Sequence, residues 1–133
     1  MGRLLGIDYG KKRIGLAITD ELRMVASPHD TYLNNAEFLG KLQKLQEKYR
    51  FDAVVLGYPH SDTYRESSAA VEAFAEILRE KLKIDVIFQN EEFTTVYMES
   101  FLKSLGYNEK QIKERIDRFA AQKILSDYLK LRQ

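Results

Sequence analysis

The sequence contains no cysteine and no apolar stretch long enough to span a membrane. The lack of cysteine among its 133 residues excludes disulfides, zinc–thiolate sites and thiol chemistry. A membrane-spanning helix needs about 20 consecutive apolar residues, and no run in this chain approaches that length. The N-terminus enters a predicted strand without a signal peptide. We therefore expect a soluble cytoplasmic protein.

Neither composition nor net charge singles out a substrate. Hydrophobic residues make up 44% and charged residues 31% of the chain, an ordinary mixture for one globular domain with a real core. The net charge of +1 neither favours nor excludes nucleic acid. Positive charge is concentrated in residues 100–133, which hold eight Lys or Arg against four Asp or Glu. Such a segment can face phosphates, although a solvated helix surface gives the same pattern.

Apolar periodicity predicts an α/β fold with a mixed sheet. Period-two and continuous apolar runs indicate strands, and apolar residues at helical intervals indicate helices. The predicted order is three antiparallel strands followed by parallel strands joined by helices, which places helices on both faces of the sheet. The expected strands are residues 3–9, 12–19, 24–33, 51–57 and 84–89, and the expected helices are residues 36–49, 63–83, 94–105 and 108–131.

Local signals refine some of these elements. Pro28 marks the third strand as an edge or a bend. The apolar runs at residues 51–57 and 84–89 indicate buried strands. Capping-box spacing predicts helix starts at Asn34 with Glu37 and at Thr63 with Glu66, and Asn108 and Gln111 open the last predicted helix.

Asp8 is the most informative residue, because it stands inside the otherwise apolar strand of residues 4–10. A buried carboxylate costs several kcal/mol unless it is paired or holds a metal. Asp8 therefore needs a partner. One simple possibility is that it caps the turn or pairs with Lys12 or Arg13.

The surroundings of Asp8 are predicted to be small. Side chains alternate across a strand, so Gly6 and Asp8 share one face of the first strand. Gly15 and Ala17 share one face of the second strand. If the two strands form a hairpin, this side leaves room for something bulky beside the carboxylate.

Two further acids occupy positions that a solvated surface would not predict. Glu91 follows the C-terminal end of the last predicted strand, where open α/β sheets bind ligands. Asp117 lies on the last helix and shares a face with Ala120 and Ala121, which places its carboxylate at the border of the core. The alternative for Asp117 is a surface acid paired with one of two neighbouring arginines, Arg115 or Arg118.

Together, Asp8, Glu91 and Asp117 suggest a metal site. Mg²⁺ and Mn²⁺ prefer oxygen ligands, and Mg²⁺ binds a few carboxylates together with waters and substrate phosphate. Two such ions about 4 Å apart can activate water and stabilise the leaving oxygen in phosphodiester cleavage. Without a cation the acids would repel, and one pKa would rise strongly. Acids dispersed over a chain are nevertheless not a specific signal.

Residues 6–17, which read GIDYGKKRIGLA, closely resemble the opening of the YqgF (RuvX) family. These small bacterial proteins are described as Holliday junction resolvases and, later, as pre-16S rRNA nucleases. The resemblance continues through LGYP at residues 56–59, Glu91 with the two following Thr, and Asp117 with the two following Ala. It therefore spans nearly the whole chain in the right order.

The resemblance implies a ribonuclease-H-like fold in a single nuclease domain, residues 1–133. It implies that Asp8, Glu91 and Asp117 are the catalytic acids that hold Mg²⁺ or Mn²⁺, in a two-metal site. It favours maturation of the 5′ end of pre-16S rRNA, with cleavage of four-way DNA junctions as the alternative. A junction resolvase should dimerise with two-fold symmetry. The oligomeric state expected here is a monomer or a weak homodimer.

The chain departs from the family around the second acid. The family usually reads Asp-Glu-Arg-Leu-Thr-Thr, whereas residues 90–95 here read Asn-Glu-Glu-Phe-Thr-Thr. An Arg would suit phosphate binding, and Glu92 reverses that charge. Glu92 is also an alternative to Glu91 as the ligand, since neighbours on an extended segment point opposite ways. These changes motivate a second class of function, a nucleic-acid-binding module that has lost catalysis.

A third class is excluded more readily. Actin-like and sugar-kinase proteins also carry Gly-Ile-Asp-x-Gly phosphate loops, but they need two such lobes and this chain has one. No Walker loop or dinucleotide fingerprint is present.

The candidate substrate-binding residues lie in the predicted turn and loops around the acids. The basic turn after Asp8 could hold a phosphate or could simply be solubilising. The polar loop after residue 59 follows a strand end suited to ligand contact, although a loop without chemistry fits equally well. The candidates are Lys11, Lys12, Arg13, His60, Ser61, Thr94 and Thr95.

Overall fold

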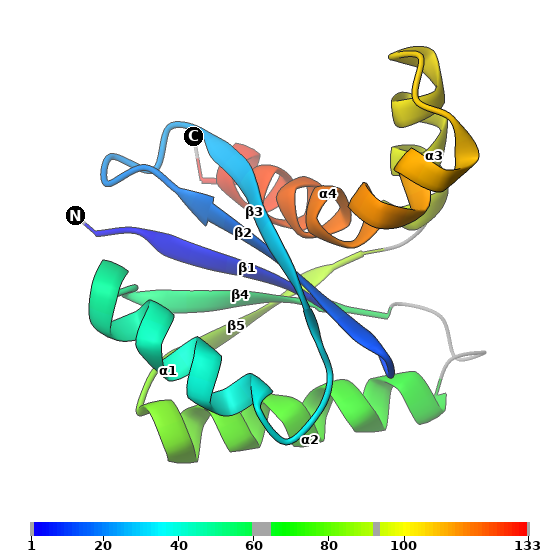
Figure 1. The fold of residues 1–133 in the computed structure, drawn as a ribbon. Helices are drawn as coiled ribbons and strands as arrows, with labels where there is room; N and C mark the ends of the chain where they lie inside the picture. Colours follow the sequence, from blue (N-terminus) through cyan, green and yellow to red (C-terminus); the bar gives the residue numbers. More distant parts are fainter. Residues whose placement is uncertain (1, 60–64, 92–93, 133) are drawn as a thin grey trace.

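A five-stranded mixed sheet forms the centre of the protein (Figure 1). The computed structural model describes residues 2–59, 65–91 and 94–132, and for residues 65–67 and 95 it describes the backbone alone. The elements within these ranges follow the predicted order. They are β1 (Leu4–Tyr9), β2 (Arg13–Thr19), β3 (Ala26–Leu33), α1 (Phe38–Tyr49), β4 (Ala53–Tyr58), α2 (Arg65–Leu82), β5 (Asp85–Asn90), α3 (Thr94–Ser104) and α4 (Glu109–Lys130).

The strand order in the sheet is β3-β2-β1-β4-β5. β1 pairs antiparallel with β2, and β2 pairs antiparallel with β3. β1 pairs parallel with β4, and β4 pairs parallel with β5. The C-terminal ends of β1, β4 and β5 therefore lie at the same edge of the sheet, the place where open α/β sheets bind ligands.

Helices cover both faces of the sheet, as the sequence predicts (Figure 1). α1 and α2 cover the face formed by the alternate large residues of β1, β2 and β4, whereas α4 lies across the opposite face and α3 packs on α4. Burial of each large aliphatic side chain contributes about 1.5–3 kcal/mol. On the first face the sheet contributes Leu5, Ile7, Ile14, Leu16, Val54 and Leu56 to the core. On the second face the sheet contributes Leu4, Ala17 and Val55, which pack with Ala121, Ile124 and Leu125 of α4.

The prediction that β5 is a buried strand is wrong. β5 pairs with β4 alone and forms an edge of the sheet. Its residues are half-buried or exposed, and Phe88 is 39% exposed. The apolar run predicts burial on both faces, but the sheet order leaves this strand with a single neighbour.

β3 forms the other edge, as Pro28 predicts, and it begins at Ala26 instead of residue 24. Its pairing with β2 shifts between Leu16 and Ala17, a β-bulge at the sheet edge.

The predicted helix starts have different outcomes. The start at Asn108 and Gln111 is confirmed, and the two residues form a full capping box with both hydrogen bonds at 2.9 Å. The Asn34 prediction is wrong, because the Asn34 side chain donates to the carbonyl oxygen of Gly10 at 2.8 Å and α1 begins four residues later without a side-chain cap. The Asn34 side chain therefore stabilises the turn between β1 and β2 and does not cap α1. The Thr63 box lies outside the described residues.

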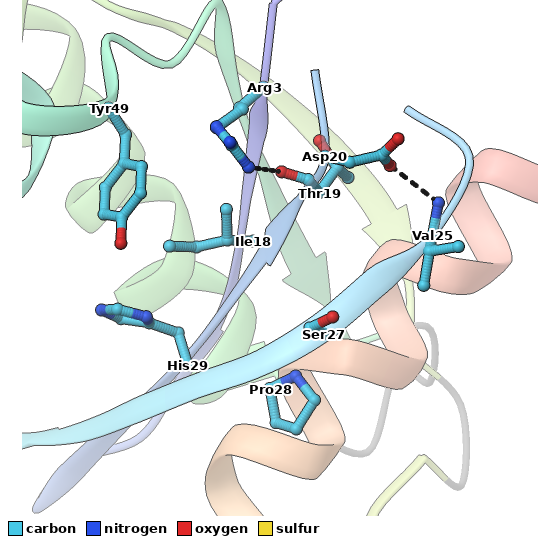
Figure 2. A pocket seen from close by; sticks show the side chains of 9 residues that line it. All are labelled: Arg3, Ile18, Thr19, Asp20, Val25, Ser27, Pro28, His29 and Tyr49. Atoms are coloured by element: carbon cyan, nitrogen blue, oxygen red, sulfur yellow. Dashed lines mark hydrogen bonds between the residues drawn. The ribbon is translucent and has the colours of Figure 1, made fainter. Parts of the chain in front are cut away.

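A groove of about 240 Å³ opens at the end of the sheet where β1 begins (Figure 2). Arg3, Tyr49 and His29 line one part of it. The guanidinium of Arg3 donates to the carbonyl oxygen of Thr19 at 2.9 Å and lies over the ring of Tyr49.

Among the helices that the structure describes, none has the length and apolar character needed to cross a membrane.

Candidate active site

Asp8 lies on the face of the sheet that α4 covers, near the C-terminal end of β1. It pairs in register with Gly15, and Gly6 pairs with Ala17, so the small-residue neighbourhood predicted from the sequence is confirmed. The bulky element that uses this space is α4 itself. A Cβ atom added to Gly6 would lie 2.9 Å from the Cβ of Leu125 on that helix.

The carboxyl group of Asp8 meets the carboxyl group of Glu91. Burial is the main reason that the pKa of Asp8 lies well above its ordinary value, and the nearby charge of Glu91 and a hydrogen bond to it raise the pKa further. Burial also raises the pKa of Glu91, and the hydrogen bond with Asp8 partly opposes that rise. Two contacting carboxylates in a desolvated site cannot both ionise without cost. In the absence of a cation, the pair therefore favours sharing a proton.

Glu91 follows β5 directly and is held at the sheet edge by two backbone hydrogen bonds. Its amide donates to the carbonyl oxygen of Tyr58 at 3.2 Å, and its carbonyl oxygen accepts from the amide of Thr94 at 3.1 Å. Its carboxylate lies over Gly57: a Cβ atom at position 57 would come within 2.7 Å of the Glu91 carboxylate. Gly57 at the end of β4 thus provides the space in which Glu91 reaches Asp8.

Asp117 comes from α4, and Gly15 fixes the position of its backbone. A Cβ atom on Gly15 would lie 1.9 Å from the carbonyl oxygen of Asp117, so only glycine permits this approach. The side chain of Asp117 accepts a hydrogen bond from Nε of Arg13 at 2.9 Å. The expected alternative partners, Arg115 and Arg118, are not the partners seen. The charge of Asp117 still contributes to the raised pKa of Asp8.

The residues at this site fit a hard divalent cation. Asp8 and Glu91 supply two half-buried, contacting carboxylates, and Mg²⁺ is commonly held by one or two carboxylates with waters and substrate phosphate. A cation between them would remove the repulsion that raises the pKa of both groups. In the described part of the chain, no three Asp, Glu or His side chains gather closely enough to hold one ion. The structure therefore brings two of the three predicted acids together and turns the third toward Arg13.

The remaining candidates lie at different depths. Lys11 and Lys12 are exposed in the β1–β2 turn, and the side chain of Arg13 is 42% exposed at the start of β2. Thr94 is buried at the start of α3. His60, Ser61 and Glu92 lie outside the described residues, as does the side chain of Thr95.

Sequence reasoning missed two features of the site. The pairing of Arg13 with Asp117 joins residues 104 positions apart, and no local pattern signals it. The role of Gly57 as space for Glu91 was also missed. A glycine that ends a continuous apolar strand often marks close approach of another group, so that signal was available.

Comparison with known proteins places the chain in a family. The model of the family described as "RuvX: Holliday junction resolvase" matches residues 2–131. A protein of Salinibacter ruber is 36% identical over 132 residues, covering 96% of this chain and 92% of that protein. A protein of Bacillus cereus is 35% identical over 133 residues, covering 96% and 97%. Both carry the name "Putative pre-16S rRNA nuclease".

Solved structures share the fold at low sequence identity. RuvC of T. thermophilus, in complex with a Holliday junction substrate, has a TM-score of 0.59 at 13% identity, covering 99% of this chain and 96% of that chain. Fowlpox virus resolvase, in complex with Holliday junction DNA, has a TM-score of 0.59 at 14% identity, covering 97% of each chain. These similarities confirm the ribonuclease-H-like fold. The family match and the curated relatives show that this chain belongs to the RuvX family.

Proposed function

We propose that this chain is a metal-dependent nuclease that cleaves precursor 16S rRNA. The observation that carries the proposal is the contact between the half-buried carboxyl groups of Asp8 and Glu91 at the C-terminal ends of the parallel strands. Such a pair is costly in the folded protein unless a ligand neutralises it. Sequence similarity to nucleases supports a catalytic metal ion as this ligand, because relatives about 35% identical over nearly the whole chain are named pre-16S rRNA nucleases.

In this proposal Asp8 and Glu91 hold Mg²⁺ or Mn²⁺, and Asp117 completes the acidic set. When bound, the cations would activate water and stabilise the leaving oxygen of the phosphodiester. Asp8 and Glu91 would lose their shared proton as the cation binds, because metal ligands must be deprotonated. We propose that the site binds two such cations.

The basic residues of the β1–β2 turn would position the substrate. Lys11, Lys12 and Arg13 project near the C-terminal end of β1, where they can contact phosphates next to the acids. We also propose His60, Ser61, Thr94 and Thr95 as substrate-binding residues. We further propose that residues 1–133 act as one nuclease domain, and that a monomer is enough for cleavage of RNA.

Cleavage of four-way DNA junctions is the second candidate. The description of the matching family supports it. A junction offers two symmetric cleavage positions, so this version needs a two-fold dimer. Molar mass measured by light scattering, with and without junction DNA, separates the two versions.

The decisive experiment compares substrates side by side. The purified protein is incubated with a 5′-extended 16S rRNA precursor, a four-way DNA junction and a linear DNA duplex, each in Mg²⁺, in Mn²⁺ and in EDTA. We expect metal-dependent cleavage of the precursor RNA and no cleavage in EDTA. Cleavage of the junction with intact RNA would replace the proposal by the resolvase version. Binding without cleavage in either metal would indicate a module that has lost catalysis.

A further inference from the structure

The ion pair between Arg13 and Asp117 occupies an unusual place. It links the first residue of β2 to the middle of α4, with Nε of Arg13 2.9 Å from Oδ2 of Asp117. The Arg13 side chain is 42% exposed and that of Asp117 is 20% exposed. The pair therefore stands at the mouth of the site, with the arginine on the solvent side.

The backbone of Asp117 lies directly against the strand next to Asp8. Its carbonyl oxygen lies against Gly15, so closely that a methyl group added to Gly15 would overlap this oxygen severely. Gly15 is in turn paired in register with Asp8. Because α4 already approaches β2 this closely, the change of partner that we infer below is a turn of the Asp117 side chain and not a movement of the helix toward the sheet.

Two groups compete for the carboxylate of Asp117. Arg13 holds it in this structure, and a cation held by Asp8 and Glu91 would attract it from the other side. An ion pair at a partly exposed surface is weak. A guanidinium also binds phosphate in a bidentate, charge-assisted geometry, so a substrate phosphate at the mouth of the site can take Arg13 away from Asp117.

We propose that Arg13 is a positioning residue that keeps Asp117 turned away from Asp8 and Glu91 until a substrate phosphate engages its guanidinium. The inference rests on the proposed function, since it assumes a phosphate-bearing substrate and a divalent cation. The complete acidic set then forms only when nucleic acid is present. The free protein would hold its cation through Asp8 and Glu91 alone, and therefore weakly.

Mn²⁺ affinity measured by calorimetry without nucleic acid tests this directly. Arg13→Gln should bind Mn²⁺ about threefold to fivefold more tightly than the wild type, because Asp117 is released. In an Asp117→Asn background, Arg13→Gln should leave Mn²⁺ affinity unchanged. Arg13→Lys keeps the charge next to Asp117 and should restore the weaker wild-type affinity. Lys12→Gln removes the same charge from the neighbouring exposed position and should change Mn²⁺ affinity by less than about twofold.

Three results would overturn the proposal. They are equal Mn²⁺ affinity of wild type and Arg13→Gln, an equal gain for Arg13→Gln in the Asp117→Asn background, and an equal gain for Lys12→Gln. The last two would indicate a general charge effect. A nucleic-acid arm supplies a second readout: a non-cleavable phosphorothioate RNA should tighten Mn²⁺ binding in the wild type and not in Arg13→Gln.

Asp8→Asn separates this inference from the proposed function. If Asp8→Asn binds Mn²⁺ as the wild type does, the proposed metal site is wrong. If Asp8→Asn loses Mn²⁺ binding while Arg13→Gln matches the wild type, the metal site stands and only the role of Arg13 fails. Circular dichroism and thermal melting of each variant confirm that the folded proteins are being compared.

Discussion

The polar groups at the two ends of the central sheet have partners of opposite kinds. At the end where β1 begins, the buried hydroxyl of Thr19 accepts a hydrogen bond from the amide of Leu4 at 2.8 Å. Figure 2 shows Arg3 donating to the carbonyl oxygen of Thr19 and the carboxylate of Asp20 accepting from the amide of Val25. The same carboxylate also accepts from the amide of Met24. Each group has a partner of opposite hydrogen-bonding character.

At the end where β1 finishes, Asp117 pairs with Arg13, but the other two acids are partners of each other. Asp8 faces Glu91, carboxyl against carboxyl, and burial opposes the ionisation of both. Buried polar groups in native proteins normally have complementary partners. An arrangement that lacks them lowers stability, and such sites are commonly functional.

Under the proposed function, the contrast separates an end whose polar groups stabilise the fold from an end whose acids bind a ligand. The Thr19 end is complete within the protein, so changes there should alter stability and leave catalysis intact. In the described part of the chain, no positively charged group partners Asp8 or Glu91, so substitution of either acid should alter catalysis and relieve a cost in the metal-free protein. Four experiments break or sharpen this comparison.

The largest expected effect is the loss of cleavage in Asp8→Asn. The amide cannot supply an anionic ligand, so we expect the cleavage rate of precursor rRNA in Mg²⁺ or Mn²⁺ to fall at least about a hundredfold. The far-ultraviolet circular dichroism should stay that of the wild type. Wild-type rates would show that the site is misassigned.

Gly15→Ala should show that the close approach of α4 is required. The added methyl group would overlap the Asp117 backbone, and we expect a loss of about 1–3 kcal/mol in the free energy of unfolding, measured in urea. Gly40→Ala is the matched control, because nothing lies within 4 Å of the added Cβ on α1. That variant should gain about 0.5–1 kcal/mol from helix propensity. Equal behaviour of the two variants would contradict the close contact.

Thr19→Val tests the opposite end. Loss of the hydroxyl leaves the amide of Leu4 buried without its acceptor, which should cost about 1–3 kcal/mol of unfolding free energy. We expect the cleavage rate per folded molecule to match the wild type. A drop in that rate comparable to the effect of Asp8→Asn would remove the distinction between the two ends.

The smallest expected effect is the pH dependence of metal-free stability. The folded-state pKa of Asp8 is raised above its ordinary value of 3.8. Its contribution to stability is therefore complete below about pH 3.8 and is lost as the pH rises through the folded-state pKa. Asp8→Asn removes this loss.

In EDTA, Asp8→Asn should thus melt at a higher temperature than the wild type near pH 8, by about 3–6 °C or about 1 kcal/mol, and the difference should shrink toward pH 4. Mn²⁺ should raise the melting temperature of the wild type and have less effect on the variant. A difference that grows toward acid pH has the wrong sign and would contradict the assignment.

Much of the fold could be predicted from the sequence, because its signals are local. The period-two pattern of β1 and β2 placed Asp8 opposite small residues, and the structure pairs it with Gly15. Asn108 and Gln111 lie close in sequence, so their capping box could be predicted from spacing alone. Predictions failed where a distant segment competed for the same group, as when Asn34 bonds to Gly10 instead of capping α1.

By itself, the sequence determined the order of the elements, the face on which Asp8 lies and the family to which the chain is similar. Only the tertiary structure decided that Glu91 meets Asp8 across Gly57 and that Asp117 turns to Arg13. The reason is physical. Alternation and helical periodicity follow from backbone geometry within a few residues. These contacts depend instead on the chain connections that bring the end of β5 and the helix α4 close to the C-terminal end of β1.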